Sequence, residues 1–187
     1  MLAAVYHGIN DLRIEEVEKP AIGEDEALLR VKAAAICGTD LRILASGHFK
    51  ISQGMTCILG HELAGQVVEV GPRVRGLVPG MRIAIAPNIG CGTCEECIQG
   101  RDHLCPNYEA FGISLNGAFA EYMRIPAPFI QRGNIVFVPE GISYEDAALN
   151  EPFSCCYHGS RTCRIEPGDV VLIVGAGPIG IMHLLLA

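Results

Sequence analysis

Hydrophobic and polar residues alternate over much of the first 140 positions of the chain. In residues 26–33, Ala27, Leu29, Val31 and Ala33 share one face, and the charged side chains lie on the other. This period of two predicts a half-buried β-strand. Short segments of similar character predict strands at residues 12–17, 66–70, 82–86, 119–125 and 135–138. Proline and glycine turns bound most of them, a punctuation typical of a barrel or sandwich.

The pattern changes after Pro139. Residues 143–148 predict the start of a helix, with Ser143 as the N-cap and Asp146 at the capping-box position. Residues 155–161 predict a second helical stretch. The chain therefore passes from a β-rich part to a part that contains helices.

The pattern of residues 170–186 predicts a strand, a turn and a helix. Val170–Val174 is a continuous apolar, mainly β-branched run, typical of a strand buried on both faces of a parallel sheet. Residues 175–180 are rich in glycine, and residues 181–186 predict a helix. The stretch from 170 to 187 is about long enough to span a bilayer, but its closely spaced glycines and proline argue against a membrane span.

Composition narrows the classes of function. The 187 residues carry 14 Lys and Arg against 21 Asp and Glu, a net charge of −7, which argues against non-specific nucleic-acid binding. Nine cysteines are an odd number for a fully paired disulfide framework, and the N-terminus lacks the basic and apolar regions of a signal peptide. A reducing, cytoplasmic location is expected, where clustered cysteines bind metal or do chemistry.

Four cysteines have the spacing of a metal site. Cys91, Cys94 and Cys97 follow one another at intervals of three, and Cys105 completes the set within fifteen residues. Four thiolates suit a closed, tetrahedral structural zinc site. A disulfide pair or a redox Cys-x-x-Cys would leave at least two cysteines beside it, and a zinc finger for nucleic acid conflicts with the net charge. The spacing therefore favours structural zinc.

A second set of candidate ligands is scattered along the chain. Cys37, His61, Glu62 and Glu151 are individually weak signals, because a lone cysteine is usually a small hydrophobe and a lone histidine a satisfied polar residue. Together they supply the thiolate, imidazole and carboxylates of a catalytic zinc that keeps an open coordination position. We expect one catalytic and one structural Zn²⁺.

The glycine-rich turn has the pattern G-x-G-x-x-G between a predicted strand and a predicted helix. In that context Gly175 makes the tight turn, Gly177 lets the backbone approach a pyrophosphate, and Gly180 permits close packing. The helix N-terminus, with Pro178 and Ile179 in its first turn, offers N–H groups to the phosphates. The expected cofactor is NAD or NADP.

These motifs together resemble the zinc-containing medium-chain alcohol dehydrogenases. The residues that carry the resemblance are Cys37-Gly38-Thr39-Asp40, Gly60-His61-Glu62-Leu63-Ala64-Gly65, the four-cysteine loop, Gly117-Ala118-Phe119-Ala120-Glu121-Tyr122, Glu151-Pro152 and the segment from Gly168 to Gly180. The resemblance implies a mostly β, GroES-like barrel catalytic domain followed by the truncated start of an α/β Rossmann domain. We place the first at residues 1–155, incomplete, and the second at residues 156–187.

The resemblance also implies roles for single residues. Cys37 and His61 match ligands of the catalytic zinc, and Glu62 matches an acidic neighbour of the metal or its water. Glu151 matches the carboxylate ligand of the sorbitol (iditol) and threonine dehydrogenase branch, and Thr39 matches the catalytic hydroxyl that hydrogen-bonds the substrate oxygen. Arg42 departs from the family, because many relatives have a relay histidine at that position.

The expected activity is hydride transfer from a secondary alcohol or polyol to NAD(P) by the full-length protein. L-Threonine and simple secondary alcohols are the alternative substrates, and a non-catalytic, zinc-stabilised GroES-like binding module is the alternative class. We expect a homo-oligomer, a dimer or tetramer, with neither nucleic acid nor membrane as a partner. The 187 residues alone are expected to keep the structural zinc and to be inactive.

Overall fold

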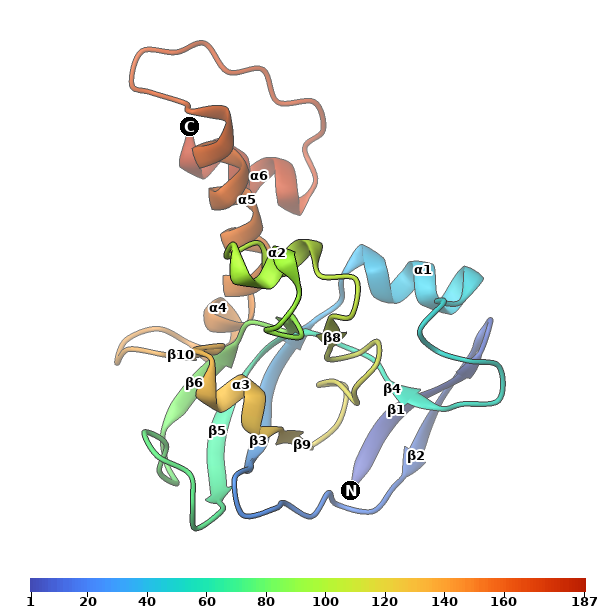
Figure 1. Ribbon diagram of the computed structural model, residues 1–187. Helices are drawn as coiled ribbons and strands as arrows, with labels where there is room; N and C mark the ends of the chain where they lie inside the picture. Colours follow the sequence, from blue (N-terminus) through green and yellow to red (C-terminus); the bar gives the residue numbers. More distant parts are fainter.

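Three β-sheets form the framework of residues 1–137. The computed structural model describes residues 1–187 (Figure 1). The largest sheet is antiparallel, with the strand order β10 (Ile135–Phe137), β6 (Arg82–Ile85), β5 (Glu62–Val70), β3 (Ala27–Ala35) and β9 (Tyr122–Ile125). The second has the order β2 (Asp11–Glu16), β1 (Leu2–Gly8) and β4 (Cys57–Ile58), and the third pairs β7 (Asn88–Ile89) with β8 (Glu109–Ala110). The predicted β-rich architecture is confirmed.

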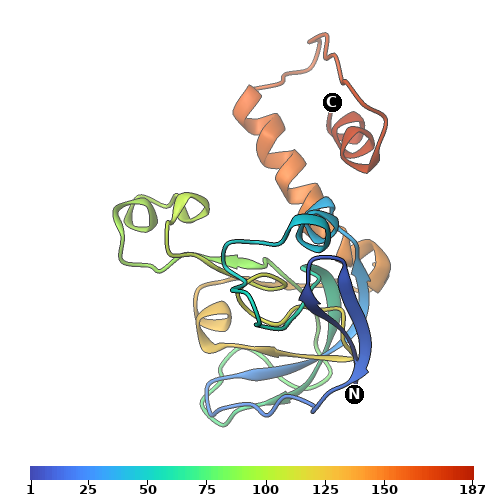
Figure 2. The same cartoon turned by 90° about the vertical axis from the view of Figure 1, so that its right-hand side faces the viewer.

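The segment before β9 connects the two larger sheets. The Ala4 N–H donates to the Phe119 carbonyl at 2.7 Å, so this segment runs beside β1. Two residues later, the Val31 N–H donates to the Glu121 carbonyl at 3.0 Å, so the same segment also borders β3. The sheets therefore share one hydrogen-bonded wall and curve around a common interior, which gives the barrel-like shape in Figures 1 and 2.

A cluster of thirteen buried hydrophobic residues fills that interior. Leu29, Val67 and Ile83 come from three adjacent strands, and the rings of Phe111 and Phe129 pack with their centroids 4.4 Å apart. Burial of each such side chain contributes roughly 1.5–3 kcal/mol. The core therefore fixes the large sheet, from whose ends the candidate ligands project.

Of the six strands predicted before residue 140, five overlap an observed strand over most of their length. The sixth, predicted at 119–125, overlaps an observed strand only in its second half. The segment predicted at 119–125 becomes a strand only at Tyr122, because residues 119–121 make the connecting bonds to β1 and β3. Strand β5 begins at Glu62, four residues before the predicted start. Strand β1 has no counterpart among the sequence predictions. In β3, Leu28 is buried as well as Leu29, because the register against β5 shifts between them and interrupts the alternation.

Helices lie around the sheets and at the C-terminal end of the chain. They are α1 (Gly38–Ser46), α2 (Glu95–Ile98), the 3₁₀-helix η1 (Asp102–Leu104), α3 (Ala127–Gln131), α4 (Tyr144–Ala148), α5 (Asn150–Cys163) and α6 (Pro178–Leu186). Helices α4 and α6 are close to the predicted ones, and the predicted helix at 155–161 is the centre of α5. No helix combines the length and the apolar character needed to cross a bilayer.

The cap of α4 differs in one detail from its prediction. Ser143 accepts a hydrogen bond from the Asp146 N–H at 3.0 Å, as an N-cap should. A capping box would add a bond from the Ser143 N–H to the Asp146 carboxylate. Instead, the Ser143 hydroxyl donates to that carboxylate at 2.7 Å.

The predicted strand at Val170–Val174 is wrong for this structure. The segment has no regular secondary structure, and Val170, Leu172 and Val174 are almost fully exposed. A strand needs a hydrogen-bonded partner, and none of the strands lies beside this segment. The neighbouring α6 packs against α5, which extends away from the barrel (Figure 2). The predicted domain boundary at 155/156 falls inside α5 and stays a prediction.

Candidate metal centres

The four cysteines of the predicted structural site converge in one projecting lobe. Cys91 follows β7, Cys94 and Cys97 lie at the start of α2 and within it, and Cys105 follows η1. Their sulfur atoms all lie within 4.8 Å of one another. The lobe is the green segment that extends from the barrel in Figure 2. A short loop with two single turns of helix therefore brings four thiols to one point.

Hydrogen bonds inside the lobe already favour thiolates. The N–H groups of Cys91 and Cys94 donate to the sulfurs of Cys105 and Cys91, at 3.2 and 3.4 Å. Hydrogen bonds from Thr93 and Cys94 lower the pKa of the Cys91 thiol to about 6. The Gly92 N–H lowers the pKa of Cys97, but burial and the neighbouring thiols outweigh it and raise that pKa to about 12. Without a cation, ionisation of one thiol opposes ionisation of the next, so the set fits a divalent metal.

The backbone of the lobe needs its glycines. Gly92 and Gly100 have φ angles of +79° and +73°, which L side chains rarely adopt. A Cβ on Gly90 would stand 2.5 Å from the sulfur of Cys97. Arg132 closes the outside of the lobe, because its guanidinium donates to the Gly90 carbonyl at 2.7 Å and to the Cys91 carbonyl at 3.3 Å. Sequence reasoning had assigned no role to Arg132.

The second candidate centre forms where two neighbouring strands end. Strands β3 and β5 are antiparallel, and Ala35 at the end of β3 pairs with Glu62 at the start of β5. Cys37 therefore lies directly beside His61 and Glu62. One ligand atom of each of these three residues lies within 4.8 Å of the other two. Strand pairing thus brings together residues that are 24 or more positions apart in the sequence.

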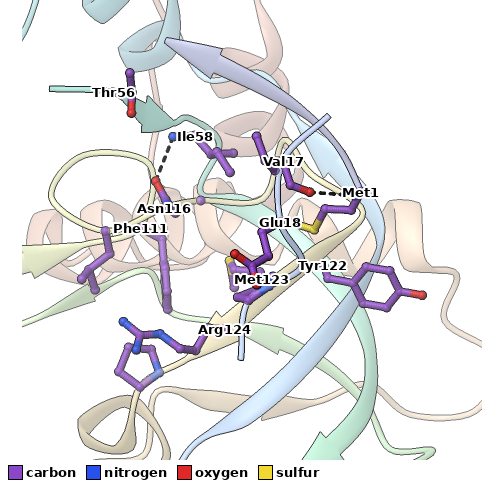
Figure 3. Close-up of a pocket in the computed structure, with 14 residues that line it drawn as sticks. Met1, Val17, Glu18, Thr56, Ile58, Phe111, Asn116, Tyr122, Met123 and Arg124 are labelled. Carbon is purple, nitrogen blue, oxygen red and sulfur yellow. Dashed lines mark hydrogen bonds between the residues drawn. The ribbon is translucent and has the colours of Figure 1, made fainter. Parts of the chain in front are cut away.

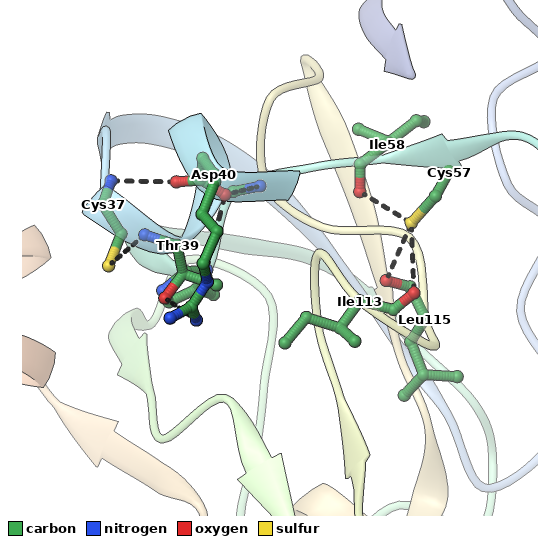
Figure 4. A network of polar contacts seen from close by, with 10 residues as sticks. Cys37, Thr39, Asp40, Cys57, Ile58, Ile113 and Leu115 are labelled. Carbon is green, nitrogen blue, oxygen red and sulfur yellow. Dashed lines mark hydrogen bonds and ion pairs between the residues drawn. The ribbon is translucent and has the colours of Figure 1, made fainter. Parts of the chain in front are cut away.

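Asp40 organises this centre, a role that sequence reasoning had not assigned to it. Its carboxylate is buried, accepts from the Cys37 N–H at 2.8 Å and from the Gly60 N–H at 3.2 Å, and lies 3.6 Å from Nδ1 of His61 (Figure 4). It thus fixes the loops that carry Cys37 and His61. The sequence showed Asp40 only as a carboxylate at the start of a helix. The loop of Gly60, to which it binds, lies twenty residues further along the chain.

The electrostatics of His61 and Glu62 fit a cation. Burial by itself lowers the pKa of His61, but Asp40 and Cys37 outweigh burial and raise it to about 9. Nδ1 of His61 is buried and has no hydrogen-bond partner, and the facing Asp40 favours a proton there, which would leave Nε2 free to bind a metal. Burial raises the pKa of Glu62, and the nearby Glu151 carboxylate contributes in the same direction. A bound cation would compensate this buried acid.

Glu151 lies near the centre but outside its compact group. It is in the first turn of α5, which follows α4, and α4 packs on β3 and β5. Its carboxylate accepts a hydrogen bond from the Cys155 thiol at 3.6 Å. The structure thus places Glu151 close enough to interact electrostatically with Glu62 but does not join it to Cys37 and His61.

Thr39 is held at the edge of the same centre. It lies in the first turn of α1, and its N–H donates to the Cys37 sulfur at 3.4 Å (Figure 4). Its Oγ1 accepts a hydrogen bond from Nη2 of Arg42, also at 3.4 Å. A hydroxyl therefore lies next to the candidate ligands, with a guanidinium behind it.

The glycine turn has the predicted tight geometry around Gly175 and Gly180. Gly175 has a φ of +113°, and a Cβ on Gly180 would stand 2.0 Å from the Gly175 carbonyl oxygen. Gly177 is the N-cap of α6, and a Cβ there would meet nothing within 4 Å. A hollow of about 680 Å³ is lined by the five predicted cofactor residues, Gly175, Gly177, Pro178, Ile179 and Gly180, among others.

A separate cavity of about 220 Å³ lies between the N-terminus and β9 (Figure 3). Its rim is closed by two hydrogen bonds, from the Met1 amino group to the Val17 carbonyl at 2.8 Å and from the Ile58 N–H to Asn116 at 3.1 Å. None of the predicted site residues lines it. We therefore assign it no part in the chemistry.

Comparison with known proteins agrees with the fold. Residues 23–134 match the family model described as the alcohol dehydrogenase GroES-like domain. The chain is 37% identical to sorbitol dehydrogenase of Bacillus subtilis over 191 residues, which covers all of this chain and 52% of that protein. It is 41% identical to L-threonine 3-dehydrogenase of Xanthomonas euvesicatoria over 175 residues, 90% of this chain and 48% of that protein.

Solved structures lead to the same family. A putative zinc-binding dehydrogenase of Sinorhizobium meliloti, bound to NADP, superposes with a TM-score of 0.89 at 37% identity over 99% of this chain and 52% of that one. Galactitol-1-phosphate dehydrogenase of Escherichia coli gives 0.88 at 29% identity over 100% and 52%. The chain thus spans about half the length of these relatives. From the family match and the shared fold, we conclude that it belongs to the zinc-containing alcohol dehydrogenases with a GroES-like domain.

Proposed function

We propose that this chain forms the catalytic part of a zinc-dependent oxidoreductase that transfers hydride from a secondary alcohol or polyol to NAD(P). The observation that carries the proposal is the position of Thr39 beside the compact group of Cys37, His61 and Glu62, with its N–H donating to the Cys37 sulfur. Because the chain spans about half of its relatives, the activity is proposed for a protein that joins it to a complete dinucleotide-binding domain.

Cys37, His61 and Glu151 are proposed to hold the catalytic zinc, with Glu62 next to the metal or its water. When bound, zinc supplies a Lewis acid for the substrate oxygen, and the dinucleotide supplies a hydride acceptor. The Glu151 carboxylate replaces a third soft ligand, so this centre should hold zinc less tightly than four thiolates do. Its mixed donor set is the one that sequence reasoning assigned to an open catalytic site.

The residues of the chain position the substrate and move its proton. The Thr39 hydroxyl accepts a hydrogen bond from the substrate hydroxyl. As the substrate proton moves to Thr39, the Thr39 hydroxyl gives its own proton to solvent water, so the threonine stays neutral. Arg42 cannot take that proton onward, since a guanidinium is a donor only. Asp40 orients His61 and the loop of Cys37, so it acts through these residues and not on the substrate.

Two further sites complete the proposal. Cys91, Cys94, Cys97 and Cys105 are proposed to bind a structural zinc that fixes the projecting lobe. Gly175, Gly177, Pro178, Ile179 and Gly180 are proposed to bind the pyrophosphate of NAD or NADP, where the backbone can approach it closely. We also propose a dimer or tetramer for the whole protein, with domains at 1–155 and 156–187.

L-Threonine is a second candidate substrate. The observation that favours it is the 41% identity to L-threonine 3-dehydrogenases, against 37% to sorbitol dehydrogenase. Both reactions oxidise a secondary alcohol at the same kind of centre, so the fold does not separate them. A panel of substrates separates the two reactions.

The test is NAD and NADP reduction by the zinc-loaded protein with a complete dinucleotide-binding domain, with polyols, secondary alcohols and L-threonine as substrates. We expect Cys37→Ala and Glu151→Ala to abolish turnover while the protein remains folded, because each removes a ligand. Cys163→Ala is the control, since Cys163 is exposed at the end of α5. Wild-type protein that holds both zincs and NAD(P) but oxidises none of the panel would instead indicate a non-catalytic, zinc-stabilised module.

A further inference from the structure

Arg42 is a cation beside the candidate catalytic centre. It lies one turn after Thr39 on α1, so the two side chains share one face of the helix. Its bond to Thr39 Oγ1 is the one side-chain hydrogen bond that Arg42 makes, and no carboxylate lies within 4.0 Å of it. The guanidinium has five N–H donors, so most of them are free for a ligand.

Lys50 adds a second cation to the same region. Its ammonium donates to the Tyr108 carbonyl at 2.5 Å and lies 4.2 Å over the Tyr108 ring, but it has no carboxylate partner. His48 lies between the two cations in the sequence. Burial lowers the pKa of His48, and the positive charges of Arg42 and Lys50 lower it further. Arg42, His48 and Lys50 therefore lie close enough to interact electrostatically, and Arg42 alone of the three contacts Thr39.

We propose that Arg42 is a specificity-determining residue that selects alcohols with an anionic group, a carboxylate or a phosphate, near the reacting carbon. This inference rests on the proposed function, which places the substrate hydroxyl against Thr39. A hydroxyl hydrogen-bonded to Thr39 would lie within about 6 Å of Nη2 of Arg42. A carboxylate one or two carbons from the reacting carbon reaches that distance. A guanidinium binds such a group with two parallel hydrogen bonds.

A neutral polyol would leave this cation without its matching partner. It can hydrogen-bond to Arg42, but it lacks the charge that makes such bonds about twice as strong. Arg42 is also exposed, so it is not needed to neutralise a buried carboxylate of the chain. The proposed substrates are thus hydroxy acids or polyol phosphates, in preference to their neutral analogues.

The experiment compares matched substrates in the zinc-loaded protein with a complete cofactor domain. One pair is 3-hydroxybutanoate and 1,3-butanediol, and the other is glucitol 6-phosphate and glucitol. We expect Arg42→Gln to lower the ratio of kcat/KM for the anionic over the neutral member by about tenfold or more, the effect of one charged hydrogen bond. Arg42→Lys should keep part of the ratio. The substrate pair whose kcat/KM ratio falls shows whether Arg42 selects a carboxylate or a phosphate.

Arg75→Gln is the matched control, because Arg75 is exposed and donates only to the neighbouring carbonyls of Pro72 and Val74. It should leave the ratio unchanged. An equal fall for both members of each pair in Arg42→Gln would overturn the proposal, since Arg42 would then act only by positioning Thr39. Unchanged ratios would overturn it as well.

A binding measurement keeps this proposal separate from the proposed function. If no substrate of the panel is oxidised, the proposed activity fails, and calorimetry with 3-hydroxybutanoate still tests the anion site. Weaker binding to Arg42→Gln than to wild type, by fivefold or more, supports the inference. Equal affinity for the two proteins refutes it.

Discussion

Asp40 shows how much of the candidate catalytic centre depends on a residue that is not itself a ligand. Its two oxygens accept from the backbone of Cys37 and of Gly60, so one carboxylate joins the two loops that carry the ligands. It also faces Nδ1 of His61, which would leave Nε2 free for the proposed zinc. The geometry of the centre is therefore set by a second layer of bonds around Cys37 and His61.

Asp40→Asn should weaken zinc binding at this centre by about 10- to 100-fold, the usual cost of losing an outer-sphere partner. The amide keeps the shape of the side chain but loses the charge that faces His61. Competition with a chromogenic chelator measures the affinity. Asp11→Asn is the control, because Asp11 pairs with Arg13 on an exposed strand. Equal zinc affinity for Asp40→Asn and wild type would contradict the prediction.

Cys57 predicts a pH effect that does not involve either metal centre. Its buried thiol has the carbonyl oxygens of Ile58, Ile113 and Leu115 within reach of its one S–H donor, and burial raises its pKa from 9.0 to about 12 (Figure 4). Between those values the unfolded chain has lost the proton that the folded chain keeps. The free energy of unfolding should therefore fall as pH rises from 9 to about 12, by at most about 1.4 kcal/mol per pH unit.

Urea titrations of wild type and Cys57→Ala measure this slope. The variant is expected to lose stability at every pH through its cavity, but its free energy of unfolding should fall less steeply above pH 9. Alkylation gives an independent check: at pH 8, Cys163 should react and Cys57 should not, because only Cys163 is exposed. Parallel slopes for the two proteins would refute the assignment.

At the scale of elements, what the sequence could predict depended on whether the signal was local. The turns around the strands, the Ser143 cap and the spacing of Cys91 to Cys105 are local, and the structure contains each of them. Strand β1 was missed because its alternation is weak. The strand at Val170–Val174 was predicted from its apolar run, but a strand forms only against a partner.

The residues of the candidate site also divide into those that local motifs predict and those whose position depends on distant contacts. Residue types and short motifs predicted Cys37, His61 and Glu62, and strand pairing brings them together. Asp40 was not assigned a role, because its value depends on Gly60 in another loop. Glu151 was predicted as a ligand, yet it lies outside the compact group, since its place is set by how α5 leaves α4. Its role as a ligand stays a prediction.

The glycine turn allows packing and cofactor binding to be separated with two matched variants. Gly180→Ala should disrupt the turn, because its Cβ would collide with the Gly175 carbonyl at 2.0 Å. Gly177→Ala meets nothing within 4 Å, so the turn should keep its stability, but the added methyl would stand where the pyrophosphate approaches.

Calorimetry with NAD and NADP and thermal unfolding test this pair in the protein with a complete cofactor domain. We expect Gly180→Ala to lower the melting temperature and Gly177→Ala to leave it nearly unchanged while weakening cofactor binding by about tenfold or more. A Gly177→Ala variant with wild-type affinity would show that the phosphates do not approach this turn.

At the scale of the whole molecule, the C-terminal end exposes a large apolar surface. Val170 and Val174 are 101% and 92% exposed, and Leu184 and Leu185 on α6 are 68% and 73% exposed. Soluble monomers rarely present contiguous apolar patches of this kind. We expect the same residues to be covered in a protein that contains the rest of a dinucleotide-binding sheet, where Val170–Val174 would find the partner that a strand needs.

Residues 1–187 expressed alone should therefore self-associate, and removal of residues 167–187 should reduce that association. The barrel and its cysteine lobe make most of their contacts without α6, so the shorter chain should still fold and bind one tight zinc. Light scattering across a concentration series measures association, and Leu184→Glu with Leu185→Glu in the longer chain is the matched test of the apolar face. If the double variant associates as strongly as wild type, the contact lies elsewhere, and the exposed end of α6 is not the surface that a second domain covers.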